Sequence, residues 1–175
     1  MRSDGISNNT RDQPLPPPSA TQEKAEATVW KGNHRVLIVD DNAINRKLLA
    51  VFMKKRKIAF AEAKDGKEAL ETYRDAEEKF NIVLMDISMP VMDGMTSTRL
   101  IREHEKKNGL TPAHIIVLTG LTSASAKLEA WTSGVDSFLT KPVNFHRLED
   151  LMKTGKGGEG TGFLHTSEKD TPSSL

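Results

Sequence analysis

Five polar side chains stand where short apolar runs of the sequence end. Asp40 and Asp41 follow VLIV, Asp86 follows IVLM, Thr119 follows IIVL, and Lys141 closes SFLTK. Three carboxylates that meet at one place would raise one another's pKa values unless a cation neutralised them. The chain contains no cysteine, and a set of oxygen donors favours a hard divalent ion, most naturally Mg²⁺. We therefore predict a magnesium site where these strand ends converge.

Such a cluster could carry out phosphoryl transfer. With a cation in place, a carboxylate can attack phosphorus and form an aspartyl phosphate. The reaction depends on positioning and charge neutralisation, which Mg²⁺, a lysine ammonium and a hydroxyl group supply. Lys141 and Thr119 offer the last two groups. Taken singly, each aspartate could be a turn former or helix cap and Thr119 an ordinary strand residue, so the prediction depends on the five residues together.

The segments that would position these residues alternate between strand and helix patterns. Apolar runs bounded by turn residues predict strands over 35–40, 58–63, 81–86, 114–119 and 136–141. Helical spacing predicts helices after Asn42, over 65–79, 94–107 and 123–134, and around 145–152. Nearly continuous apolar strands are typical of a parallel sheet covered on both faces. We expect a three-layered α/β fold, whose ligands bind at the carboxyl ends of the strands.

The apolar residues of the first and last helices recur at helical spacing. They are Ile44, Leu48, Val51 and Phe52 in the first helix, and Phe145, Leu148, Leu151 and Met152 in the last.

One folded domain is expected over residues 33–153. Residues 1–32 are rich in proline and small polar residues, which predicts a disordered segment or linker. A Pro-x-x-Pro pattern at Pro14 and Pro17 also fits a ligand of an aromatic groove. Residues 154–175 contain five of the twelve glycines and predict a flexible glycine-rich tail.

The composition argues against several classes of function. The net charge is +1, and no segment has the basic excess typical of a nucleic-acid binder. The apolar runs are much shorter than the roughly 20 residues that a membrane-spanning helix needs. We expect a cytoplasmic segment that contacts neither nucleic acid nor membrane.

Four motifs resemble one family. VLIVDDNAINRKLL, VLMDISMPVMDGM, IIVLTG and DSFLTKPV make the chain from about His34 to about Lys153 similar to the receiver domain of two-component and phosphorelay response regulators. It looks most like the receivers of fungal hybrid sensor histidine kinases. The resemblance implies a flavodoxin-like (βα)5 fold, a doubly wound five-stranded parallel sheet of order 2-1-3-4-5.

The resemblance also implies a role for each acidic residue. Asp86 would be the phosphoacceptor. Asp41 and Asp86 would bind Mg²⁺ directly with Asp40 close behind, and the backbone carbonyl of Ser88 would be a third protein ligand.

Three further roles follow from the same resemblance. Lys141 would contact the phosphoryl oxygens, with a cis peptide bond to Pro142. Thr119 would reach for the phosphoryl group on activation, and Phe138 would be the aromatic switch that responds to Thr119.

The implied function is that of a receiver that accepts a phosphoryl group on Asp86 from a phosphohistidine and switches conformation. Its partner would be a histidine phosphotransfer protein or a kinase phosphohistidine domain, docked over the Asp86 edge and beside the first helix. Such a receiver catalyses only its own phosphorylation and dephosphorylation. It could belong to a hybrid histidine kinase or stand free as a response regulator.

Two alternatives from other classes stay open. A pseudo-receiver would act only as a protein-binding module. The other is a hydrolase that works through an aspartyl phosphate and resembles the haloacid dehalogenase group. Such enzymes have a second aspartate two residues after the nucleophile, where this chain has Ser88.

Overall fold

The computed structural model describes residues 34–120 and 124–154 as five strands alternating with five helices. The strands are β1 (Arg35–Val39), β2 (Ala59–Ala63), β3 (Ile82–Asp86), β4 (His114–Thr119) and β5 (Ser137–Thr140). The helices are α1 (Ala43–Lys55), α2 (Gly66–Asp75), α3 (Gly94–Lys107), α4 (Ala124–Thr132) and α5 (Phe145–Thr154). Every predicted element is present.

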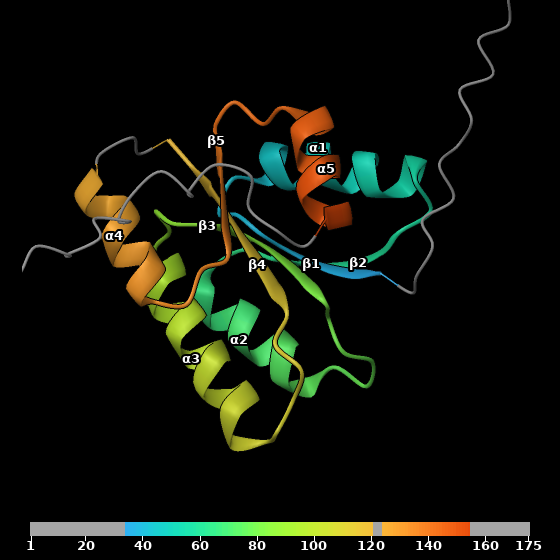
Figure 1. Ribbon diagram of the computed structural model, residues 1–175. Coiled ribbons are helices and arrows are strands. Elements are labelled where there is room, and N and C mark those ends of the chain that lie inside the picture. Colours follow the sequence, from blue (N-terminus) through green and yellow to red (C-terminus); the bar gives the residue numbers. More distant parts are fainter. Residues whose placement is uncertain (1–33, 121–123, 155–175) are drawn as a thin grey trace, which may run out of the picture.

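The five strands form one parallel sheet in the order β2-β1-β3-β4-β5. Helices α1 and α5 cover one face, and α2, α3 and α4 lie on the other (Figure 1). Two apolar clusters fill the spaces between the sheet and the helices on its two faces. One joins the sheet to Leu49, Phe52, Leu148 and Leu151, and the other joins it to residues such as Leu70, Ile101 and Ala130. The predicted fold class and strand order are therefore confirmed.

The flanking predictions lie largely outside the described residues. This holds for the disordered segment 1–32, its Pro-x-x-Pro pattern, and residues 155–175. Thr154, the first residue of the predicted tail, is the last residue of α5. Among the described helices, none has the length and hydropathy of a membrane span.

The apolar residues of α1 do not all face the core. Phe52 is buried, but Ile44, Leu48 and Val51 have 70%, 54% and 44% of their surface exposed. Leu49, Ala50 and Met53 are buried instead. Apolar residues extend around most of this helix, so their spacing does not determine which side packs on the sheet. The stripe of α5 does pack as predicted: Leu148, Leu151 and Met152 are buried.

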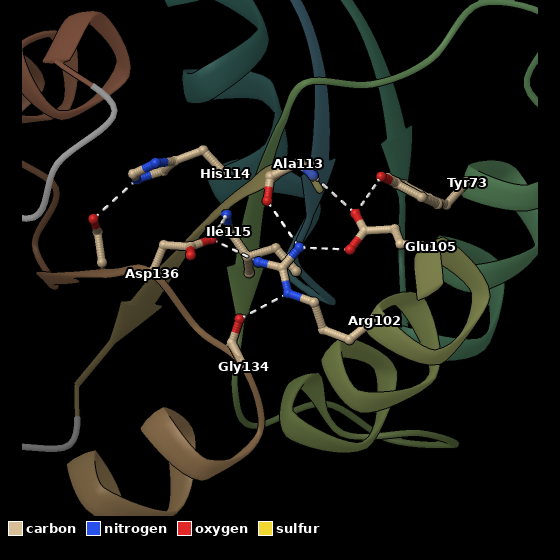
Figure 2. A network of polar contacts seen from close by, with 9 residues as sticks. Tyr73, Arg102, Glu105, Ala113, His114, Ile115, Gly134 and Asp136 are labelled. Carbon is tan, nitrogen blue, oxygen red and sulfur yellow. Dashed lines mark hydrogen bonds and ion pairs between the residues drawn. The ribbon is translucent and has the colours of Figure 1, made fainter. Parts of the chain in front are cut away.

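A buried ionic network links α3 to the start of β4 and to the loop between α4 and β5 (Figure 2). The start of β4 is the opposite end of that strand from Thr119. The carboxylate of Glu105, 1% exposed, accepts hydrogen bonds from the hydroxyl of Tyr73 at 2.6 Å and from the backbone N–H of Ala113 at 2.8 Å. The guanidinium of Arg102 donates to Glu105, to Asp136, and to the carbonyls of Gly134 and Ala113. Arg102 thus links α3 to the start of β4 and to the loop between α4 and β5.

The loop between β3 and α3 contains a strained turn. Val91 has a φ of 68°, in a region that β-branched residues seldom adopt. The N–H of Met92 donates to the carbonyl of Pro90 at 2.8 Å, which closes a three-residue γ-turn centred on Val91. The side chain of Val91 is 79% exposed, so burial contributes little to offset the strain.

Replacing Val91 by asparagine is expected to stabilise the protein. Asparagine tolerates positive φ better than valine, and relief of the strain should raise the free energy of unfolding by about 1 kcal/mol. Urea unfolding followed by circular dichroism measures the change. Val51→Asn, the same substitution at an exposed helical position, is the control and should lower stability. A loss of stability in Val91→Asn would contradict the strain assigned to this turn.

Candidate functional site

The three aspartates predicted to meet do so at the carboxyl edge of the sheet. Because β1 and β3 are neighbours with Val39 opposite Met85, Asp40 and Asp86 leave the sheet side by side. One carboxylate oxygen from each of Asp40, Asp41 and Asp86 lies within 4.8 Å of the others. Asp40 and Asp86 are buried, whereas Asp41 is exposed to solvent.

Lys141 reaches this cluster from the end of β5. Its ammonium lies 2.9 Å from Asp40 Oδ2 and 3.2 Å from Asp86 Oδ1. Its backbone N–H donates to the carbonyl of Thr119 at 2.9 Å. The peptide bond to Pro142 is cis, as the resemblance implied. Lys141 therefore bridges two of the three carboxylates.

The pKa values of this pair reflect burial and mutual charge. Burial raises the pKa of Asp86; Lys141 acts in the opposite direction without cancelling this effect, and the charge of Asp40 adds to it. Burial by itself would lower the pKa of Lys141, but the hydrogen bond to Asp40 and the charges of Asp86 and Asp40 outweigh it, so this pKa is raised. The lysine stays a cation beside its partners.

Gly94 allows the start of α3 to lie against the backbone of Asp86. A Cβ at Gly94 would lie 2.0 Å from the carbonyl oxygen of Asp86, so no other residue fits without movement of the backbone. The N–H of Gly94 donates to the carbonyl of Ile87 at 2.9 Å. Ser88 lies exposed in the loop between β3 and α3, and its carbonyl as a metal ligand stays a prediction. Asp93 is the N-cap of α3: its carboxylate accepts a hydrogen bond from the Thr96 N–H at 2.8 Å.

Thr119 and Phe138 lie on the neighbouring strands β4 and β5, where Val117 pairs with Phe138 and Thr119 with Thr140. Thr119 ends β4 beside β3 and is 2% exposed. Phe138 is half-buried against the core cluster beneath α3 and α4. Its ring meets that of Trp131 edge-on, with centroids 5.0 Å apart. Phe138 is therefore outside the acidic cluster, where a switch residue would transmit a change rather than take part in chemistry.

Two residues near the cluster were not predicted from the sequence. Asn45 donates to both carboxylate oxygens of Asp40, at 3.3 and 3.2 Å. Arg46 donates to the backbone carbonyls of Asp40 and Asp41, at 2.8 and 3.3 Å. Both lie in the first turns of α1, four and five residues after Asp41. This short spacing is the one feature of the sequence that could have indicated their contact with the aspartates.

The donor set fits Mg²⁺. Asp40 already accepts from Asn45, from Lys141 and from the Asn42 N–H at 2.9 Å, so it suits a supporting role. Asp41, exposed, and Asp86 offer the carboxylate oxygens. A hard ion that keeps several waters and takes few carboxylates matches this arrangement.

Comparisons with known proteins agree with this geometry. A family model described as "Response regulator receiver domain" matches residues 36–153. A curated relative, hybrid signal transduction histidine kinase A of Dictyostelium discoideum, is 37% identical over 142 residues, which are 81% of this chain and 6% of the relative. The chain thus spans only a small part of that protein.

Solved structures show the same arrangement of strands and helices. The receiver domain of the Saccharomyces cerevisiae response regulator Ssk1, crystallised with the histidine phosphotransfer protein Ypd1, has a TM-score of 0.63 and 38% identity over 67% of this chain and 84% of that one. CheY in a complex with CheX, BeF3 and Mg²⁺ from Borrelia burgdorferi has a TM-score of 0.61 and 28% identity over 68% and 86%.

Proposed function

The chain belongs to the response regulator receiver domain family, and on that premise we propose that Asp86 is its phosphoacceptor, taking a phosphoryl group from a phosphohistidine. The observation that carries this assignment is the contact of one lysine with two buried carboxylates beside an exposed third. Asp86 is the carboxylate at the end of the central strand β3.

The reaction needs little from the protein beyond positioning and charge. An oxygen of Asp86 attacks phosphorus, the bond from phosphorus to the donor's imidazole nitrogen breaks, and the imidazole keeps that electron pair. Lys141, 3.2 Å from Asp86 Oδ1, is placed to pair with the phosphoryl oxygens. Mg²⁺, held by Asp41 and Asp86, would neutralise charge on the transferred group. The similar CheY complex contains Mg²⁺, which supports this choice of metal.

The phosphoryl group would shift the protein between two conformations. A new group changes such an equilibrium only by contacts that differ between the states. Thr119, at the end of β4, and Lys141 would make those contacts. Phe138, packed on Trp131 of α4, would carry the change to the surface formed by α4 and β5.

We assign the phosphodonor partner to the α1 face. The similar Ssk1 receiver was crystallised with a histidine phosphotransfer protein, which supports a partner of that kind here. Ile44, Leu48 and Val51 expose apolar surface on α1. A cavity of about 190 Å³ lies between Leu48, Phe145, Val143 and Lys141, so this apolar surface continues to the edge of the acidic cluster.

Leu48→Ala is expected to slow transfer from a phosphorylated histidine phosphotransfer protein at least about tenfold, because Leu48 lies next to the acidic cluster and truncating a side chain near the centre of an interface can cost more than about 1 kcal/mol. Labelling by acetyl phosphate needs no docked partner and should change less than about twofold. Leu128→Ala, the same truncation of an exposed residue on α4, is the control and should leave both rates unchanged. Equal transfer rates for Leu48→Ala and wild type would remove α1 from the docking site.

The wider context follows from the relatives. They include a hybrid histidine kinase and a response regulator, so the chain is either one receiver of a hybrid histidine kinase or a response regulator. We propose a cytoplasmic location, because a receiver must meet its phosphodonor.

Incubation with acetyl phosphate and Mg²⁺, followed by intact-mass measurement, tests the function. We expect the mass of one added phosphoryl group, and we expect chelation of Mg²⁺ to prevent it. A folded chain that takes up none would instead be a pseudo-receiver that acts by binding proteins. Sustained hydrolysis of phosphate esters would favour the hydrolase alternative.

A further inference from the structure

The acidic pair Asp40–Asp41 depends on a bend in the chain. In a regular strand, successive side chains point to opposite faces, so two adjacent aspartates would not reach one site. β1 ends at Val39, and the backbone bends two residues later, at Asp41. This bend lets both carboxylates approach Asp86, with one oxygen of each within 4.8 Å of the others. Whatever holds the bend also gathers the carboxylates.

Arg46 holds this bend from α1. One nitrogen of its guanidinium, Nη1, donates to the carbonyl oxygens of Asp40 at 2.8 Å and Asp41 at 3.3 Å. Two successive carbonyls can share one donor only where the chain turns. The bonds therefore stabilise the turned backbone and not an extended continuation of β1.

The guanidinium also pairs with a carboxylate on the neighbouring strand. Its Nε lies 3.5 Å from Glu62 Oε2 on the neighbouring strand β2, and the Arg46 side chain is 19% exposed. The planar guanidinium offers several donors in a rigid array, so Arg46 connects the edge of the sheet to the bend.

We propose that Arg46 is a positioning residue for metal binding: by binding the two carbonyls, it sets the directions in which Asp40 and Asp41 project. This inference rests on the proposed magnesium site. Arg46 would act only through Asp40 and Asp41, touching neither the metal nor the phosphoryl group.

Charge and positioning predict opposite effects for the same substitution. A guanidinium near a bound cation repels it, so charge alone predicts that Arg46→Met would bind Mg²⁺ more tightly. If Arg46 positions the acidic pair, its loss relaxes the bend and weakens binding. The sign of the change therefore distinguishes the two effects.

The test is a Mg²⁺ titration of the full chain, followed by the amide NMR signals of Asp41 and Asp86. The Kd of Arg46→Met is expected to rise about tenfold, as is typical when a residue supporting a metal ligand is lost. Lys47→Met removes the same charge from the next, exposed position of α1 and is the control, with a change below about twofold. In metal-free protein, the amide signals of Asp41 and Asn42 should also shift in Arg46→Met and not in Lys47→Met.

An unchanged or lower Kd in Arg46→Met would overturn the inference while leaving the proposed function intact. Should this variant not fold, Arg46→Gln removes the charge with a shorter polar side chain, and the same criterion applies to it. A wild-type chain with no saturable Mg²⁺ binding would instead overturn the metal site, and this inference with it.

Discussion

Asp86→Asn is expected to abolish phosphorylation. The amide has the shape of the carboxylate but lacks its charge and nucleophilic oxygen, so acetyl phosphate and a phosphohistidine donor should both fail to label the protein. Loss of a nucleophile typically removes several orders of magnitude from a rate. Intact-mass measurement after incubation with acetyl phosphate and Mg²⁺ should show only the unmodified chain.

Asp93→Asn is the matched control for that result. Asp93 lies in the same loop and caps α3, and asparagine caps helices as well as aspartate does. This variant should fold and accept one phosphoryl group. Stoichiometric labelling of Asp86→Asn would move the phosphoacceptor to another residue, with Asp41, the exposed carboxylate of the cluster, the next to test.

Arg102→Met is expected to destabilise the fold by about 3 kcal/mol. It leaves the buried carboxylate of Glu105 without its ion-pair partner, and breaking a buried pair from one side costs several kcal/mol. The pair is close, 2.7 Å between Arg102 Nη1 and Glu105 Oε2. The variant also removes the bonds that hold Gly134 and Asp136. Urea unfolding at neutral pH measures the loss.

A double-mutant cycle separates the stranded charge from lost packing. Glu105→Gln removes the charge and keeps the side chain, so Arg102→Met combined with Glu105→Gln should recover part of the stability lost by Arg102→Met alone. Arg99→Met is the control, because Arg99 is exposed on the same helix and bonds Ser133 at 3.3 Å. It should cost less than about 1 kcal/mol. An Arg102→Met variant as stable as the Arg99 control would refute this account of the network.

Tyr73 belongs to the same network, and the pKa of its hydroxyl reflects its burial and the contact with Glu105. Burial, and then its hydrogen bond to Glu105, hold the pKa of Tyr73 above its usual range. The hydroxyl therefore stays protonated and donates to Glu105. The stability that this bond gives is present below the ordinary tyrosine pKa and is lost at higher pH, where the unfolded chain ionises.

The fold and the converging site residues were predictable from the sequence because both depend on short segments. Three of the five predicted strands are nearly continuous apolar runs, a pattern typical of a parallel sheet with two covered faces. In such a sheet the carboxyl ends share one edge, so Asp40, Asp86 and Lys141 had to approach one another. The structure confirms that they do, while their chemical roles stay proposals for the experiments above.

Only the tertiary structure decided which apolar side of α1 is buried. Leu48 and Leu49 are adjacent in the sequence, yet Leu48 is exposed and Leu49 buried. Their types do not distinguish them. Leu49 is buried in the apolar cluster that α1 forms with the sheet and with α5, where the ring centroids of Phe52 and Phe145 are 5.0 Å apart.

The sequence by itself thus determined the strands, the layers and the polar residues at the strand ends. The tertiary structure decided the partners of Arg46 and Arg102, and the exposed apolar face of α1. The physical reason is how far apart in the sequence the interacting residues are. Strand and helix patterns arise from neighbours a few residues apart, whereas an arginine on a helix has many possible acceptors, and the one that it binds depends on which chain segments the fold brings beside it.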